Sequence, residues 1–138
     1  MMYSIELHTT QRCEFIDITD RIEKVIKGSR ISEGICHIYI PHTTAGLAIN
    51  ENADPSVKKD IINTLNKLVP QNERYAHSEG NSDAHIKSSI LGGEKAIFIE
   101  NGHLKLGTWQ GIFFCEFDGP REREVWVNIN EDTTYGAK

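Results

Sequence analysis

Cysteine is scarce in this sequence of 138 residues, and the three cysteines, Cys13, Cys36 and Cys115, are odd in number and widely spaced. Each lies among residues typical of strands, so we interpret them as buried thiols of a cytosolic protein. No two of them have the short spacing of a zinc-binding pair. The sequence therefore argues against a fold held together by disulfide bonds or by a cysteine-bound zinc ion.

Long apolar runs and blocks of basic residues are also missing. No stretch approaches the length of a membrane span, and the first residues lack the apolar core of a signal peptide. We therefore expect a cytoplasmic protein with no membrane partner. The net charge of −5 argues against a nucleic-acid partner, although a local cluster of cations could still hold a small anion.

The composition is that of an ordinary globular protein, with 38% hydrophobic and 25% charged residues. No internal repeat, low-complexity segment or linker divides the chain. A chain of this length can bury a core without disulfide or metal cross-links. The sequence therefore predicts one domain spanning residues 1–138.

Apolar patterning predicts more strands than helices, without regular alternation of the two. We expect helices from Asp17 or Thr19 to just before Gly28, from Pro55 to Leu68 after an Asp54 N-cap, and from a Ser82 N-cap to about Leu91. Strands are expected at residues 3–8, 13–18, 35–40, 47–51, 95–100, 112–117 and 124–129. The predicted fold class is therefore α+β, with a largely antiparallel sheet or sandwich and about three helices on one face. The last two strands are expected to pair as a central hairpin, and the polar tail from Asn130 is expected to fray.

A concentration of polar residues precedes and opens the third predicted helix. His77, Glu79, Asp83 and His85 lie within nine positions, and a turn at Gly80 and Asn81 separates them. The helix dipole favours the negative charge of Asp83 and leaves the imidazole of His85 available as a ligand or base, while the free N–H groups around Ser82 to Ala84 can receive a phosphate. Ser82 and Asp83 could merely cap a helix beside solvated histidines, but four such residues together favour a functional site.

Polar residues also follow two of the strands and occupy two of the turns. His42 ends a strand that we expect to be buried, and Asn50 and Glu51 end the next one. Arg121 lies in a tight turn, where a guanidinium can bind a phosphate or carboxylate through two hydrogen bonds. Trp109 and Gln110, between two glycines, can form the wall of a ligand site. Taken singly, His42 is as compatible with a structural role as with a functional one, and Glu51, Arg121 and Trp109 are more often solvated or structural.

Two kinds of metal site are compatible with these residues. His42, His77 and His85 together would suit zinc or nickel. Replacing one histidine by Asp83 or Glu51 gives an oxygen-richer site, suited to magnesium or manganese around phosphate. No local metal-binding signature such as His-Glu-x-x-His is present, so spacing alone does not choose between them.

Five longer runs of the sequence, in this order along nearly the whole chain, resemble the YjbQ family, which is also described as secondary thiamine-phosphate synthases. These runs are residues 42–46, 49–55, 79–85, 106–111 and 115–121. The resemblance implies a compact α+β, sandwich-like subunit that assembles as a homotrimer. It also implies a weak activity that joins an aminomethyl-pyrimidine diphosphate to a thiazole phosphate and releases pyrophosphate.

Site roles follow from the resemblance and from residue type. Glu51 and Asp83 become candidates for binding a cation or for acting as a base. Arg121 and the helix start at Ser82 become phosphate binders, and Trp109 becomes a stacking wall. Their neighbours Asn50, Asn81 and Gln110 are predicted to contact the substrate.

Three functions remain open at this level. The first is a transferase of the thiamine-phosphate type, with magnesium on its diphosphate substrate. The second is a metal-dependent hydrolase of a small phosphorylated metabolite, in which His42, His77 and His85 hold the ion and Glu51 activates water. The third is a non-catalytic trimer that binds a metal or a small anion. Membership of a family does not by itself decide between them.

Overall fold

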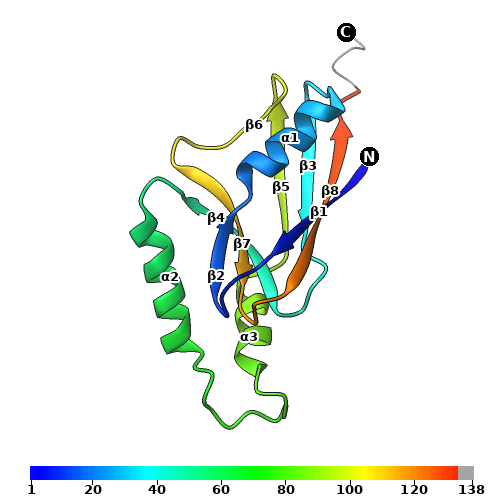
Figure 1. Ribbon diagram of the computed structural model, residues 1–138. Coiled ribbons are helices and arrows are strands. Elements are labelled where there is room, and N and C mark those ends of the chain that lie inside the picture. The colour runs from blue at the N-terminus through cyan, green and yellow to red at the C-terminus, as the bar shows by residue number, and fades with distance from the viewer. Residues whose placement is uncertain (134–138) are drawn as a thin grey trace.

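The computed structural model describes residues 1–133, in which strands and helices follow one another irregularly (Figure 1). The three helices within this range are α1 (Thr19–Ser29), α2 (Pro55–Leu68) and α3 (Ser82–Leu91). The strands are β1 (Met2–His8), β2 (Glu14–Asp17), β3 (Gly34–Tyr39), β4 (Ala45–Glu51), β5 (Glu94–Glu100), β6 (His103–Leu104), β7 (Gln110–Glu116) and β8 (Glu122–Glu131). The α+β class expected from the sequence is confirmed.

These strands form two sheets, and every neighbouring pair in them is antiparallel. The larger sheet has the order β1-β8-β3-β5-β6, and the smaller one has the order β2-β7-β4. In Figure 1, α1 lies at the top of the molecule and α3 at the bottom, while α2 stands beside the smaller sheet. The predicted sandwich of antiparallel sheets is therefore confirmed.

The main core lies between the two sheets and α1. Ile22 and Ile26 of α1, together with Ile18 just before it, follow one face of the helix at a spacing of four and are completely buried. They belong to one cluster with inward-facing side chains of both sheets, including Phe114 of β7 and Val127 of β8. This apolar packing fixes the position of the two sheets relative to each other. It therefore also fixes the position of the turns at their ends.

A second, smaller core lies between the smaller sheet and the other two helices. Leu65 of α2 and Ala84 of α3 pack there with Phe113 of β7. Asp54 caps α2 by accepting a hydrogen bond of 2.9 Å from the backbone N–H of Ser56, with Pro55 at the start of the helix, as predicted. This core holds α3 against the end of the smaller sheet.

The predicted hairpin of the last two long strands is wrong, because β7 and β8 belong to different sheets. Nearly every residue of β7 is buried, since the main core covers one face of this strand and the second core covers the other. β8 instead alternates buried and exposed residues, since only one of its faces is covered. The turn at residues 117–121 therefore carries the chain from one sheet to the other.

Three further expectations need correction. The helices do not cover one face of one sheet, because α1 packs in the main core while α2 and α3 pack in the second core. α1 continues past Gly28 to Ser29, and Arg30 ends it in a left-handed conformation with φ of 61°. Asn130 does not fray, because it pairs with Ile35 inside the larger sheet. The rest of the predicted tail, residues 134–138, lies outside the described residues.

One face of the larger sheet carries exposed apolar side chains. We call it the outer sheet face and define it by Ile35 and Tyr39 of β3, Phe98 of β5 and Trp126 of β8. The rings of Tyr39 and Trp126 stack, with centroids 5.7 Å apart and an interplanar angle of 18°. Exposed apolar groups gathered on one face are typical of a contact surface.

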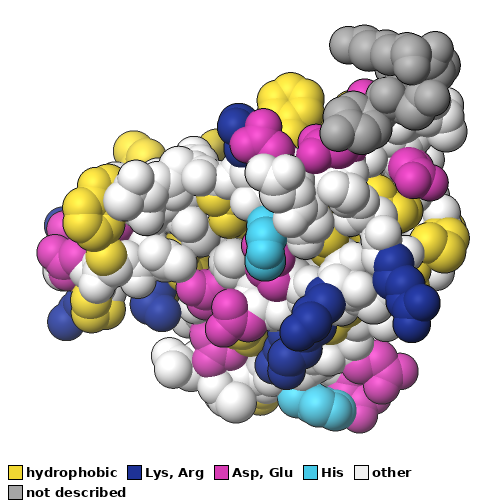
Figure 2. All heavy atoms as spheres, turned by 90° about the horizontal axis from the view of Figure 1, so that it is seen from above, with side chains coloured by type: hydrophobic (Ala, Val, Ile, Leu, Met, Phe, Trp, Pro, Cys, Tyr) yellow, Lys and Arg dark blue, Asp and Glu magenta, His cyan; other side chains and the backbone are white. Residues whose placement is uncertain are grey.

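None of the helices within residues 1–133 is long and apolar enough to cross a membrane. Figure 2 shows the molecule from above, and on this face the basic side chains stand among acidic and neutral ones without merging into a continuous basic patch.

Candidate functional site

The start of α3 is built from the turn predicted at Gly80 and Asn81. Gly80 has a positive φ of 82°, which glycine adopts without strain. Asn81, not Ser82, is the N-cap residue, and Ser82 is the first helical residue. The side-chain oxygen of Asn81 makes no capping hydrogen bond, while its Nδ2 donates a hydrogen bond of 2.9 Å to Asp118 in the turn between β7 and β8. The helix start is thus tied to that turn.

Asp83 lies in the first turn of α3, as predicted, but its side chain is completely buried between two cations. Arg12 donates to both of its carboxylate oxygens, at 3.0 and 2.9 Å, and Lys87, one helical turn later, donates to Oδ2 at 2.7 Å. Burial alone would raise the pKa of Asp83, but the hydrogen bonds and charges of Arg12 and Lys87 outweigh it and lower this pKa. The geometry therefore suits Asp83 to holding α3 in place.

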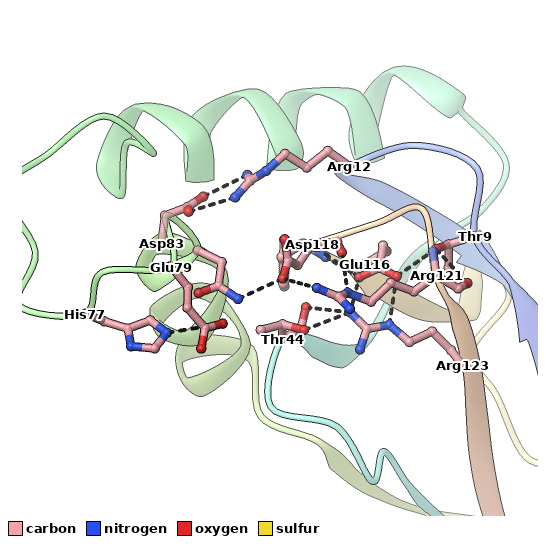
Figure 3. A network of polar contacts seen from close by, with 12 residues as sticks. Thr9, Arg12, Thr44, His77, Glu79, Asp83, Glu116, Asp118, Arg121 and Arg123 are labelled. Atoms are coloured by element: carbon pink, nitrogen blue, oxygen red, sulfur yellow. Dashed lines mark hydrogen bonds and ion pairs between the residues drawn. The ribbon is translucent and has the colours of Figure 1, made fainter.

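Arg121 keeps part of its guanidinium free. Its Nε donates to the backbone oxygen of Asp118 at 2.8 Å, and one terminal nitrogen donates to the Asp118 carboxylate at 2.9 Å. A guanidinium has five N–H donors, so its outer edge can still bind another group. The side chain is 53% exposed. Asp118 thus orients Arg121 (Figure 3). The same carboxylate binds Asn81 at the start of α3.

A second buried ion pair lies beneath this turn. Glu116, at the end of β7, is completely buried and accepts hydrogen bonds from Arg123 of β8 and from Thr9. Burial would raise the pKa of Glu116, but the bonds from Arg123, the Asp118 N–H and Thr9, with the Arg123 charge, lower it. Arg123 also donates to Thr44 Oγ1 at 2.8 Å. The pair therefore joins both sheets to the loop between β3 and β4.

His42 lies in that loop and has one ring nitrogen engaged. Its Nε2 accepts a hydrogen bond of 3.0 Å from the backbone N–H of Glu124. Burial and the charge of Arg123 lower the pKa of His42 below its ordinary value. The ring is consequently neutral at neutral pH and carries its proton on Nδ1. The next residue, Thr43, accepts a hydrogen bond of 2.6 Å from Ser88 of α3, which joins this loop to the helix.

His77 and His85 lie side by side. Their ring centroids are 5.4 Å apart and the rings are nearly perpendicular. His77 comes from the connection between α2 and α3 and lies 3.8 Å from the carboxylate of Glu79, while His85 lies on α3. Two of the three histidines predicted to share a site are thus brought together.

The three histidines do not form a ready metal site within one chain. Across residues 1–133, no group of three or more histidine, cysteine, aspartate or glutamate side chains is arranged to hold a metal ion. His42 would have to release the Glu124 N–H to offer Nε2 to a metal. A zinc or nickel ion on His42, His77 and His85 therefore stays a prediction, and it requires a movement of His42.

The remaining predicted site residues gather elsewhere, where β4 ends and β7 begins. Glu51 pairs with Gln110 in the sheet, and Asn50 Oδ1 accepts the Glu51 N–H at 2.7 Å. Gln110 Oε1 accepts the backbone N–H of Gly107 at 2.8 Å, which closes the turn that carries Trp109. The Trp109 side chain is largely uncovered, with the residue 63% exposed. Asn50, Glu51, Trp109 and Gln110 thus form one group, which we call the β4–β7 end.

The other predicted residues form a second group, which we call the α3 end: His42, His77, Asn81, Ser82, Asp83, His85 and Arg121. Its link to the smaller sheet is Glu116, which pairs with Ala45 at one end of the ladder, while Glu51 pairs with Gln110 at the other. The two pairs are six residue steps apart along β4, a distance of about 20 Å at an ordinary strand rise. The structure therefore divides the predicted site residues into two groups that do not meet within one chain.

Arginine and lysine side chains gather at the α3 end. Four cations there share three carboxylates: Arg12, Lys87, Arg121 and Arg123 with Asp83, Asp118 and Glu116. A fourth carboxylate, Glu79, lies beside His77. The chain as a whole has a net charge of −5, so this concentration of cations is local. A local positive charge beside a helix N-terminus favours an anionic ligand.

Sequence reasoning missed four residues of this network: Thr9, Arg12, Lys87 and Arg123. One signal was available for Arg123, which occupies an inward position of β8 in phase with Val125 and Val127. A charged residue at such a position needs a buried partner.

Comparisons with known proteins give one family over the chain. The family model described as UPF0047 protein YjbQ-like matches residues 3–132. The UPF0047 protein MJ1081 of Methanocaldococcus jannaschii is 56% identical over 132 residues, which cover 96% of each chain. The UPF0047 protein YugU of Bacillus subtilis is 48% identical over 94% of this chain and 98% of its own.

Solved structures agree with this assignment. A crystal structure of an uncharacterized conserved protein of the YjbQ/UPF0047 family from Clostridium acetobutylicum superposes with a TM-score of 0.91 at 52% identity, over 93% of this chain and 99% of its own. A YbjQ-like protein of unknown function from Sulfolobus solfataricus gives a TM-score of 0.91 at 33% identity, over 96% of this chain and 97% of its own. Because the family model, the relatives and the folds all cover nearly the whole chain, this protein belongs to the YjbQ, or UPF0047, family.

Proposed function

We propose that the protein is a cytoplasmic transferase of the thiamine-phosphate synthase type, with a weak or secondary activity. In this reaction the bond between the pyrimidine methylene carbon and the diphosphate oxygen breaks, and pyrophosphate leaves with the bonding electrons. The ring nitrogen of the thiazole phosphate forms the new bond to that carbon. The observation that carries the proposal is the exposed, free edge of the Arg121 guanidinium, which Asp118 holds beside the start of α3.

The α3 end is the proposed binding site for phosphate groups. The outer edge of the Arg121 guanidinium can bind two phosphate oxygens at once. The first N–H groups of α3, at Ser82 and Asp83, have no side-chain cap and add the positive end of the helix dipole. Together they would stabilise the negative charge that develops on the leaving pyrophosphate. Asp83 is a positioning residue, because its bonds to Arg12 and Lys87 hold the start of α3 in place.

The β4–β7 end is the proposed site for the rest of the substrate. The exposed indole of Trp109 can stack on the pyrimidine ring. Glu51, held beside Gln110 by the sheet, can bind the magnesium ion that accompanies a diphosphate or accept a proton. When bound, that ion would neutralise charge on the leaving group. Asn50 and Gln110 supply amide groups for orientation.

The proposed catalytic site needs a second copy of the chain, because the two groups of residues are about 20 Å apart. In a cyclic homotrimer each interface joins two different surfaces of neighbouring subunits. The β4–β7 end of one subunit would then meet the α3 end of the next. The exposed apolar groups of the outer sheet face supply further surface for assembly.

An assay of pyrophosphate release tests the function. Incubating the protein with magnesium and both precursors should release pyrophosphate, and leaving out the thiazole phosphate should abolish that release. Phosphate release from a panel of phosphoesters without an acceptor would instead assign the hydrolase, and binding without turnover would assign a non-catalytic trimer. Arg121→Ala and Glu51→Gln should both lose turnover, while Arg21→Ala, an exposed arginine of α1, should keep it.

A further inference from the structure

A pocket lies beside Arg12, the partner of Asp83, on the side of α2. It has a volume of about 490 Å³ and opens between the turn joining β1 to β2 and the C-terminal end of α2. Arg12 and Cys13 line it from the turn, and Asn66 lines it from the helix. Arg121 and the three histidines of the α3 end do not line it. The pocket is therefore separate from the phosphate site proposed above.

The lining of this pocket contains no carboxylate. It consists of one arginine, one thiol, one proline and four side-chain amides, the amides belonging to Gln11, Asn66, Gln71 and Asn72. Amide groups donate hydrogen bonds through their NH₂ groups without adding charge. The far wall is held in place, since the Tyr75 hydroxyl donates a hydrogen bond of 2.5 Å to the backbone oxygen of Pro70. Such a surface suits an anion that accepts several hydrogen bonds.

The charges behind the lining are unbalanced. Arg12 and Lys87 share the single carboxylate of Asp83, so the trio carries one net positive charge. Lys87 is almost completely buried, with 1% exposure, and its ammonium donates to Asp83 and to Asn66 Oδ1, each at 2.7 Å. Lys87 and Asp83 balance each other in the interior, so the unmatched charge is that of Arg12, whose side chain is 30% exposed and lines the pocket. An anion in the pocket would lie beside this charge and pair with it.

Cys13 does not supply that counter-charge. Burial raises the pKa of its thiol, although Lys87 and Arg12 oppose this effect. Its sulfur lies 3.8 Å from Asn66 Oδ1, where the neutral thiol can donate a weak hydrogen bond. Cys13 is thus an uncharged part of the wall.

We propose that this pocket binds a small oxyanion, a phosphate or carboxylate group, free or carried on a polar metabolite. Arg12 and the ammonium of Lys87 supply the charge, and the surrounding amides supply hydrogen bonds. Because both cations also hold Asp83, an anion bound here would act on the first turn of α3 and hence on the α3 end. The inference does not depend on the transferase function, since it rests on the pocket and on the charge of this trio alone.

The test follows the side-chain amide NMR signals of Gln71 and Asn72 during titration with inorganic phosphate and, separately, with acetate. The Arg121→Ala variant is used as the background, so that binding at the proposed phosphate site does not contribute. We expect saturable shifts with at least one of the two anions. Saturation by phosphate alone selects a phosphate ligand, and saturation by acetate alone selects a carboxylate.

Asn66→Asp is the decisive substitution, because it places a carboxylate beside Lys87 and balances the trio from within the protein. It should weaken anion binding by about tenfold or more while preserving the fold. Asn63→Asp is the matched control, since it adds the same charge to an exposed position of α2 one turn earlier, outside this lining. The affinity of the Asn63→Asp variant for the anion should stay within about twofold of the affinity of the Arg121→Ala background. Shifts that never saturate, or equal weakening by both substitutions, would overturn the proposal.

Discussion

Arg12 and Asp83 lie 71 positions apart in the chain and form a bidentate ion pair, with nitrogen–oxygen distances of 3.0 and 2.9 Å. The pair ties the turn between β1 and β2 to the first turn of α3. Lys87 binds the same carboxylate from inside the protein. Asn81 at the start of the same helix binds Asp118, the carboxylate that orients Arg121, so the pair holds the helix start to which the Asp118 turn is bound.

The trio of Arg12, Lys87 and Asp83 predicts strong energetic coupling between Asp83 and Lys87. Asp83→Asn and Lys87→Met should each lower the free energy of unfolding by about 3 kcal/mol, since each leaves a buried charge short of a partner. The double variant should lose at least about 1 kcal/mol less than the sum of the two. Urea unfolding of the three variants and the wild type measures this coupling. Additive losses would show that the two side chains do not stabilise each other.

Glu116 predicts a loss of stability in acid. Hydrogen bonds from Arg123, the Asp118 N–H and Thr9 lower its pKa below the ordinary value of 4.5, against the effect of burial. The stabilisation is therefore complete above pH 4.5 and is lost as the pH falls through the lower pKa of the folded protein. Urea midpoints measured from neutral pH downwards should fall more steeply below pH 4.5 in the wild type than in Glu116→Gln. Parallel curves would contradict this role for Glu116.

The surroundings of His42 predict a neutral ring with its proton on one particular nitrogen, which NMR can detect at neutral pH. Burial and the Arg123 charge lower its pKa below 6.5, so its neutral form stabilises the fold fully above pH 6.5, and this contribution is lost as the pH falls through the folded pKa. Because Nε2 accepts the Glu124 N–H, the proton should reside on Nδ1. Nitrogen-15 shifts of the ring report both the pKa and the proton position, with His42→Gln identifying the signals. A proton on Nε2 at pH 7 would contradict the geometry.

Arg121 predicts a loss of activity without a loss of stability. Its side chain is 53% exposed, so Arg121→Ala should change the free energy of unfolding by no more than about 0.5 kcal/mol. The same variant should lower kcat/KM for pyrophosphate release by about a hundredfold. Arg121→Lys should recover little of this, because an ammonium cannot bind two oxygens in the fork geometry of a guanidinium. Full activity of Arg121→Lys would show that charge alone is needed there.

Short-range features of this protein could be predicted from the sequence, because their causes lie within a few residues. The Asp54 cap with Pro55 and the position of Asp83 in the first turn of α3 follow from local chemistry. The alternation of His37 and Tyr39 with buried residues of β3 follows from the strand period.

Long-range pairing could not be predicted in the same way. Nothing near Arg12 indicates a partner 71 positions away, and Arg123 contacts a threonine 79 positions away. The hairpin error has the same origin, since the closeness of β7 and β8 in sequence did not reveal that they lie in different sheets. The division of the predicted site into two ends depends on the register of β4 and β7, in which Glu51 and Ala45 lie at opposite ends of the ladder.

The most direct test of the account asks whether the two ends form one catalytic site between subunits. Glu51→Gln and Arg121→Ala, each inactive alone, are co-expressed with different affinity tags and purified through both tags. A mixed cyclic trimer contains two subunits of one variant and one subunit of the other. In both cases, one of its three interfaces combines an intact Glu51 with an intact Arg121. The account therefore predicts pyrophosphate release at about a third of the wild-type rate. A mixed oligomer as inactive as the separate variants would contradict a site shared between subunits.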